Sequence, residues 1–270
     1  MHAFFTDVDD AYLVKELISA LDSSVKDAAG AGGIGIAFSG GLDSGIAAAL
    51  AKRHGRVMLY TAGKKDSYDI KAGEETASLM GLPWKGLEMT EDGLEKELRE
   101  MIGITGTVNP ITLSFEVPLY YVLKYSEEKV IMGGQGADEL FLGYSKYIGL
   151  NEKELADMVR DDTARLMNET LAHEKAMAEH FGKKLVYPYL DGRVADLVGR
   201  MGMNGVRPGD VRKPLLREAA KELGQPELAE RPKKAAQYGS GTMALMRSIA
   251  KKKGMTVRET VTAMAEELKR

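Results

Sequence analysis

Cysteine is absent from the 270 residues of this sequence. Its absence excludes disulfide frameworks, thiolate zinc sites, iron–sulfur clusters and cysteine nucleophiles. The sequence also lacks an apolar run of about 18 residues, the length that a membrane span needs, and its acidic residues begin at Asp7, too early for a secretory signal peptide. We therefore expect a cytoplasmic protein that is not attached to a membrane.

A large excess of one sign of charge is missing as well. The chain holds 37 Lys and Arg residues and 40 Asp and Glu residues, a net charge of −3, which argues against a nucleic-acid or membrane binder that uses its whole surface. This average hides an asymmetry, because residues 231–270 contain ten basic and three acidic residues. The basic end is either a solvated helical surface or a contact region for a phosphate backbone, and we favour the solvated surface for residues 251–253.

Apolar periodicity divides the chain into a half that alternates strands with helices and a half made of helices. We predict an N-terminal helix in residues 1–30, an α/β core with a twisted parallel sheet and helices on both faces in residues 31–150, and an α-helical region in residues 151–270 that completes the active site. No strand is expected beyond Leu140. The expected strands are residues 33–38, 57–61, 84–89 and 129–132, and the expected helices are residues 11–29, a stretch ending at 53, 69–80, 91–101, 116–126, 152–181, 191–202, 211–223, 241–253 and 256–268.

The first chemical motif is a loop of small residues directly after the first expected strand. Such a loop lets backbone N–H groups turn inward, and the next helix directs its positive end to the same point, which suits phosphate. The motif lacks the lysine of a Walker A loop, and its Asp43 implies a Mg²⁺ bridge to the phosphates. The alternative is a glycine-rich turn without a ligand. The motif consists of Ser39, Gly40, Gly41, Leu42, Asp43 and Ser44.

A second motif, GGQGADELFLGY in residues 133–144, follows another apolar strand. Ligands of an open parallel sheet gather at the carboxyl ends of its strands, so Asp138 can approach Asp43 there and the two carboxylates can hold Mg²⁺ on a polyphosphate. The alternative is that Asp138 and Glu139 are simply acidic residues favoured at a helix N-terminus.

A third motif lies in the basic end of the chain. Lys233 and Lys234 precede the glycine-rich link of ERPKKAAQYGSG. Their charge suits the stabilisation of a departing polyphosphate.

These segments together resemble a known family. SGGLDS is similar to the pyrophosphate loop of the N-type ATP pyrophosphatases, and GGQGADELFLGY resembles the GEGADELFGGY segment of asparagine synthetases. YPYLDGRVADL, RKPLLREAAKEL and ERPKKAAQYGSG resemble further segments of the same synthetase domain, which β-lactam synthetase shares. The resemblance covers about residues 30–245 in unbroken order.

The resemblance implies a fold like that of the adenine nucleotide alpha hydrolases and an AMP-forming ligase. A substrate carboxylate, with aspartate as the first candidate, would attack the α-phosphorus of ATP, and ammonia would then displace AMP from the acyl-adenylate. The resemblance implies that phosphates and Mg²⁺ are held by Ser39, Gly40, Gly41, Asp43 and Ser44, and that Asp138 takes the second metal position. It also implies that adenosine is held at Leu59, Thr61, Gly133 and Gly134. Either Lys233 or Lys234 would be catalytic.

Two departures from the family pattern affect the nitrogen chemistry. The family's glutaminase domain is not part of this sequence, so we expect free ammonia or a separate glutaminase partner to supply nitrogen. Gln135 stands where the family has the Glu that is thought to act as a base, and an amide cannot take a proton. Glu116 is a candidate replacement, although the pattern favours an exposed Glu at a helix start. A tRNA-modifying ligase and a catalytically weak nucleotide-binding paralogue are the alternative functions.

Overall fold

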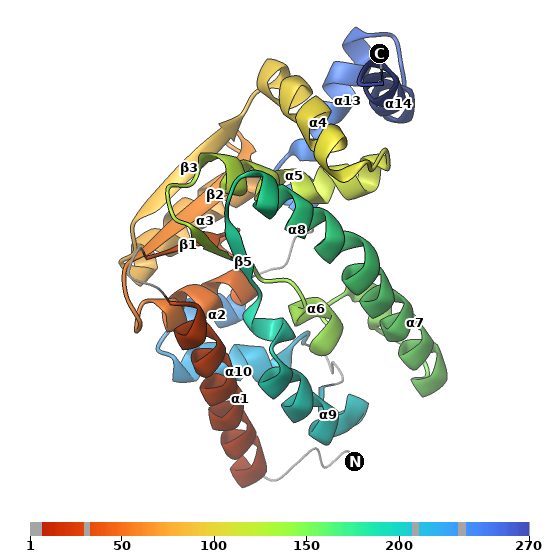
Figure 1. Cartoon of the computed structure of the whole chain (residues 1–270). Helices are drawn as coiled ribbons and strands as arrows, with labels where there is room; N and C mark the ends of the chain where they lie inside the picture. The colour runs from red at the N-terminus through yellow and green to blue at the C-terminus, as the bar shows by residue number, and fades with distance from the viewer. Residues whose placement is uncertain (1–6, 30–32, 207–210, 232–235, 270) are drawn as a thin grey trace.

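The computed structural model describes residues 7–29, 33–206, 211–231 and 236–269. Its centre is a parallel five-stranded sheet in the order β3-β2-β1-β4-β5, which confirms the predicted class (Figure 1). In the register of the sheet, Ile34 of β1 lies beside Val57 of β2 and Val130 of β4. The strands are β1 (Ile34–Ala37), β2 (Val57–Lys64), β3 (Trp84–Met89), β4 (Val130–Met132) and β5 (Lys184–Val186).

The fifth strand corrects the expectation that no strand occurs beyond Leu140. β5 pairs with β4 along Val130–Met132 and forms an edge of the sheet. It has only three residues and begins with an exposed lysine, so it lacks the buried apolar run by which the central strands were found. β5 also shows that the second half of the chain contributes to the sheet.

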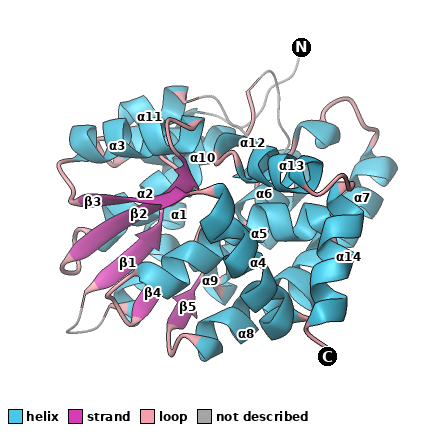
Figure 2. Cartoon of the chain, turned by 90° about the horizontal axis from the view of Figure 1, so that it is seen from above, coloured by secondary structure: helices cyan, strands magenta, loops and turns pink. Residues whose placement is uncertain are grey.

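Helices cover both faces of the sheet and enclose one apolar core on each face (Figure 2). The predicted stripe of α1 is buried in the first core, with Leu17, Leu21 and Val25 at 1% exposure or less. The helices of the first core are α1 (Asp7–Ala28), α2 (Leu42–Ala51), α3 (Tyr68–Met80), α9 (Gly192–Val206), α10 (Pro214–Glu222) and α11 (Pro226–Glu230), and those of the second are α4 (Glu91–Thr105), α5 (Pro110–Tyr125), α8 (Leu171–His180), α13 (Thr242–Lys252) and α14 (Val257–Glu267).

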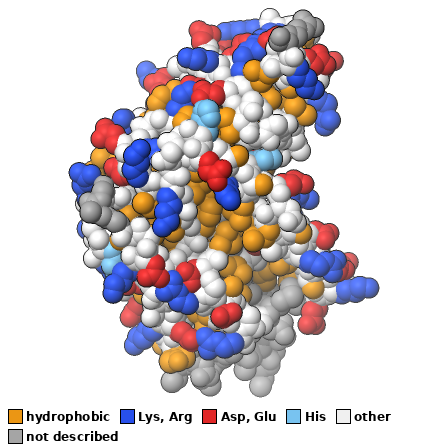
Figure 3. Space-filling view, viewed as in Figure 1, with side chains coloured by type: hydrophobic (Ala, Val, Ile, Leu, Met, Phe, Trp, Pro, Cys, Tyr) orange, Lys and Arg blue, Asp and Glu red, His pale blue; other side chains and the backbone are white. Residues whose placement is uncertain are grey.

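The remaining elements connect these layers. The helix expected over residues 152–181 is interrupted at Leu166–Thr170 by a π-helical turn between α7 and α8. Among the described residues, no helix combines the length and the apolar composition that crossing a membrane requires. On the face shown in Figure 3, apolar side chains gather in a central hollow with charged side chains around it. These remaining elements are α6 (Ala137–Leu140), α7 (Glu152–Arg165), α12 (Ala236–Gly239) and the 3₁₀ turns Ser145–Tyr147 and Pro188–Leu190.

Candidate active site

The loop that joins β1 to α2 is shaped for a bound anion. Gly40 has a φ of 71°, and a methyl group on it would lie 2.4 Å from the carbonyl oxygen of Ala72 in α3, so this position requires glycine. The backbone N–H of Ser39 donates to Ser44 Oγ at 3.4 Å. Gly41 caps α2 without a side-chain hydrogen bond, which leaves the first N–H groups of α2 available to a ligand.

Two carboxylates from different strand ends meet on one ammonium group at this loop. Lys213 Nζ lies 2.8 and 2.7 Å from the two carboxylate oxygens of Asp43, in the first turn of α2, and 2.7 Å from Asp138 Oδ1, in α6. Burial alone would lower the pKa of Lys213, but the attraction of Asp43 and Asp138 outweighs burial and raises the pKa above its ordinary value. The lysine is therefore a buried, fully charged group between the two acids.

The backbone is strained and closely packed around this lysine. Lys213 has a φ of 54°, a left-handed conformation that non-glycine residues rarely adopt, and is 3% exposed. A methyl group on Gly143 would lie 2.0 Å from both Asp138 Oδ1 and Lys213 Cε. Gly143 thus leaves the space through which the lysine reaches the acids.

A cavity that is open to solvent lies beside the Lys213 ammonium group. Arg212, Arg217 and Arg231 line it together with Lys213, so basic side chains face the glycine-rich loop across the cavity. Cationic walls opposite free helix N–H groups are suited to a polyphosphate. The other lining residues are Ser39, Gly40, Gly41, Leu42, Asp43, Tyr68, Asp69, Ala72 and Gly143.

Four residues expected to hold adenosine lie outside the lining of this cavity. Leu59 and Thr61 are buried in β2, where the Thr61 hydroxyl donates to the Phe38 carbonyl at 2.6 Å. Gly133 and Gly134 lie in the loop between β4 and α6, and a methyl group on Gly134 would be 3.3 Å from the Asp43 side chain. The Gly134 backbone therefore adjoins the carboxylate side of the site.

Lys233 and Lys234 lie outside the described residues. Two described residues that flank this stretch lie at or beside the cavity. Arg231 lines it, and a methyl group on Gly239 would lie 2.1 Å from Oδ1 of Asp69, another lining residue.

The sequence matches the family model described as asparagine synthase over residues 16–154 and 148–261. The chain belongs to the asparagine synthase family. It is 28% identical over 291 residues to a glutamine-hydrolyzing asparagine synthetase homologue of Methanocaldococcus jannaschii, covering 93% of this chain and 54% of that one. It is also 28% identical over 250 residues to asparagine synthetase B of Escherichia coli, covering 84% and 45%. The chain thus spans about half the length of these relatives.

Solved structures give weaker matches. The U34-tRNA thiolase NcsA from Methanococcus maripaludis matches at a TM-score of 0.41 and 14% identity, covering 93% of this chain and 79% of that chain. The NH3-dependent NAD synthetase from Campylobacter jejuni matches at a TM-score of 0.34 and 17% identity, covering 75% and 99%. Scores of this size support no conclusion about substrate.

Gln135, where we expected a departure from the asparagine synthase pattern, forms a hydrogen bond with a buried carboxylate. Its Nε2 donates to Glu174 Oε1 in α8 at 2.5 Å, and the hydroxyl of Tyr187 donates to the other oxygen of Glu174. Glu174 is 1% exposed, and burial raises its pKa to about 7 against the lowering effect of these two hydrogen bonds. The amide at position 135 is thus matched to a carboxylate that the sequence motifs did not reveal.

Glu116 is not the exposed residue at a helix start that we expected. α5 begins at Pro110 with Asn109 as its cap, so Glu116 lies in the middle of the helix and is 1% exposed. Its Oε1 lies 3.1 Å from His173 Nδ1. The prediction was wrong because the Asn-Pro start signal at 109–110 was overlooked.

Lys213, Arg212 and Arg217 are site residues that we did not single out individually. They belong to the segment RKPLLREAAKEL, which was noted only for its resemblance to the asparagine synthetases. The available signal was that two adjacent basic residues, Arg212 and Lys213, stand directly before an amphipathic helix. No local pattern indicates that Lys213 reaches Asp43, which is 170 positions away.

Proposed function

We propose that this member of the asparagine synthase family adenylates a carboxylate with ATP, releases pyrophosphate and then forms an amide as a nitrogen nucleophile displaces AMP. The observation that carries the proposal is the convergence of Asp43 and Asp138 on Lys213 beside a cavity lined by three arginines. A carboxylate becomes a good electrophile only when one of its oxygens joins a good leaving group. Fixed cations can stabilise the charge that grows on pyrophosphate as it leaves.

The ATP phosphates would lie between the β1–α2 loop and the basic wall. The N–H groups at the start of α2 and the Ser39 and Ser44 hydroxyls would bind the phosphate oxygens, and Lys213 would hold the charge that develops. Lys233 and Lys234 are proposed as further cations for pyrophosphate. For adenosine, we propose backbone at Leu59, Thr61, Gly133 and Gly134.

The donor set also fits Mg²⁺. Asp43 and Asp138 present hard oxygen ligands that already share one cation, and Mg²⁺ typically binds to one or two carboxylates with substrate phosphates and water. In the described part of the chain, no group of three or more His, Cys, Asp or Glu side chains is placed to bind a metal by itself. When bound at the two aspartates, Mg²⁺ would neutralise phosphate charge.

We propose aspartate as the first carboxylate to test and ammonia as the nitrogen nucleophile, either free or supplied by a separate glutaminase partner. Aspartate-dependent exchange of radiolabelled pyrophosphate into ATP tests adenylation, and a panel of carboxylates tests the choice of substrate. We expect AMP and pyrophosphate as products. Formation of ADP and orthophosphate would contradict the mechanism. Parallel assays with ammonium chloride and glutamine test the nitrogen source.

Measurements of tRNA binding and of ATP binding, made beside these assays, address the two other functions. Tight, salt-sensitive tRNA binding would favour a tRNA-modifying ligase, and ATP binding without turnover would favour a nucleotide-binding paralogue. The basic end favours neither, since Lys252 pairs with Glu91 at 2.5 Å and Lys253 with Glu95 at 2.6 Å.

A further inference from the structure

A buried pair of carboxylates lies next to the proposed ATP site. Glu116 of α5 and Glu174 of α8 are each 1% exposed. Gln135 and Tyr187 donate to the two oxygens of Glu174, whereas Glu116 Oε1 contacts His173 and its buried Oε2 has no hydrogen-bond partner in the described part of the chain. A buried acceptor without a partner is costly, so this oxygen points to a missing donor.

The pair is also short of positive charge. Within the described residues, no lysine or arginine forms an ion pair with Glu116 or Glu174. Burial, followed by repulsion from Glu174 and Glu169, raises the pKa of Glu116 to about 9. Burial lowers the pKa of His173, so this imidazole is neutral at pH 7 and does not supply the charge. The other titratable groups that face the pair are Glu139 and the hydroxyl of Tyr187, and neither is a cation.

The pair lies across the β4–α6 loop from the ATP site. At Gly134 the loop backbone approaches the Asp43 side chain, and the next residue, Gln135, reaches Glu174. On the same loop, a methyl group on Gly133 would lie 2.9 Å from the Tyr187 ring. Successive residues of one loop therefore contact the phosphate side and the carboxylate pair, which places the pair where a second substrate would be needed.

We infer that Glu116 and Glu174 form a binding site for the primary ammonium group of a substrate. An ammonium group supplies the donor that Glu116 Oε2 lacks and the charge that the pair lacks. Its binding converts the protonated carboxyl of Glu116 into a carboxylate and releases that proton to solvent. This inference rests on the proposed function, which requires either an ammonium ion as the nitrogen source or an amino acid with an α-ammonium group.

A direct binding measurement tests the site without catalysis. Methylammonium chloride is titrated calorimetrically into the full chain against sodium chloride at equal ionic strength. We expect saturable binding with proton release, strengthening about tenfold per pH unit between pH 7 and 8.5, because one proton is displaced. Glu116→Gln should weaken binding at least tenfold, whereas Glu97→Gln, which changes a buried carboxylate elsewhere, should leave it unchanged. Absence of saturable binding to the wild type, or equal binding by Glu116→Gln, would overturn the inference.

Kinetics then identify the source of the ammonium group. If it is the nucleophile, Glu116→Gln raises the KM for ammonium at least tenfold in amide formation and leaves pyrophosphate exchange intact. If it is the α-ammonium of the carboxylate substrate, the variant raises the KM for aspartate in exchange but not that for succinate, which lacks this group. Unchanged KM values for both would contradict the inference. Absence of exchange in the wild type with every carboxylate would refute the proposed function and leave the calorimetric result standing.

Discussion

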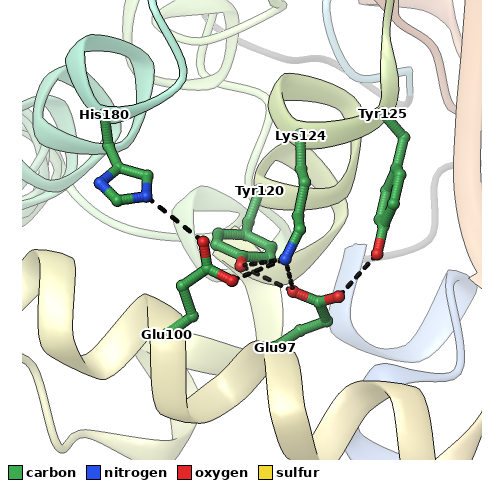
Figure 4. A network of polar contacts seen from close by, with 6 residues as sticks. All are labelled: Glu97, Glu100, Tyr120, Lys124, Tyr125 and His180. Atoms are coloured by element: carbon green, nitrogen blue, oxygen red, sulfur yellow. Dashed lines mark hydrogen bonds and ion pairs between the residues drawn. The ribbon is translucent and has the colours of Figure 1, made fainter.

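Two groups of carboxylates that both adjoin α5 differ in a single cation. Around Lys124 of α5, the ammonium group lies 2.5 Å from Glu97 Oε2 and 2.6 Å from Glu100 Oε2, and Tyr120 and Tyr125 donate to Glu97 (Figure 4). Around Glu116 of the same helix, the described residues supply no such cation. The first group contains a lysine, whereas the second has no lysine or arginine partner among the described residues.

The two groups have opposite pKa shifts for this reason. Burial alone would raise the pKa of Glu97, but hydrogen bonds from Lys124, Tyr125 and Tyr120 outweigh burial and lower it. Glu116 is as deeply buried and has no such donors, and its pKa rises to about 9. Loss of the lysine from the first group should therefore destabilise the fold, whereas the proposed ammonium site keeps Glu116 and Glu174 without a cation in the free protein.

The largest expected effect follows from removing the cation that distinguishes the groups. Lys124→Met leaves Glu97 and Glu100 without their shared partner, and we expect the free energy of unfolding in urea to fall by about 3 kcal/mol at pH 7. Lys252→Met, which removes an exposed pairing partner of Glu91, is the control and should have little effect. Equal stability of Lys124→Met and the wild type would mean that the lysine is not what separates the two groups.

A third cluster, Asp43–Lys213–Asp138, belongs to the proposed ATP site and yet contains its own cation. Gly143→Ala would place a methyl group 2.0 Å from Lys213 Cε, so the lysine must move away from the acids. We expect pyrophosphate exchange to fall about 100-fold, in the range reported for loss of one preorganised charge-stabilising group. Gly192→Ala is the matched control, because nothing lies within 4 Å of the added methyl group. Normal exchange by Gly143→Ala would show that the position of Lys213 does not matter.

Exchanging the amide and the carboxylate in the second group sharpens the comparison further. Gln135→Glu places a third carboxylate against Glu174, and we expect amide formation to fall about tenfold from like-charge repulsion. The double variant Gln135→Glu, Glu174→Gln restores one amide and one carboxylate and should recover most of the lost rate. A rise in amide formation by Gln135→Glu alone would show instead that position 135 needs a base.

The smallest expected effect is the change in the free energy of unfolding over one pH unit. The folded-state pKa of Glu116 is raised to about 9, so the stability it contributes is present at low pH and is lost as pH rises toward 9, on the order of 1 kcal/mol per pH unit. The pKa of Glu97 is lowered, so its contribution is lost as pH falls into the acid range. Urea unfolding from about pH 2.5 to pH 9 should show a flatter alkaline limb for Glu116→Gln and a flatter acid limb for Glu97→Gln. A flatter acid limb for Glu116→Gln and a flatter alkaline limb for Glu97→Gln would contradict the opposite pKa shifts of the two groups.

The sequence predicted the parts of the site that local rules determine. Asp43 and Asp138 were found because glycine-rich loops after apolar strands place side chains at one edge of a parallel sheet. β5 escaped detection because one exposed and two half-buried residues carry too little periodicity. Lys213 and Glu174 could not be placed, because the left-handed backbone of Lys213 and the pairing of Glu174 with Gln135 depend on tertiary contacts between distant segments.

The central claim is that the β4–α6 loop separates a phosphate side of the site from an ammonium side. Measuring adenylation and amide formation side by side in two variants tests this claim most directly. Lys213→Met removes the cation on the phosphate side of the β4–α6 loop, and Glu116→Gln removes one of the two carboxyl groups on the proposed ammonium side. With ammonium as the nucleophile, we predict that Lys213→Met abolishes pyrophosphate exchange, whereas Glu116→Gln keeps exchange and loses amide formation at subsaturating ammonium. If both variants lost both half-reactions equally while their urea unfolding midpoints stayed unchanged, the separation into a phosphate side and an ammonium side would be contradicted.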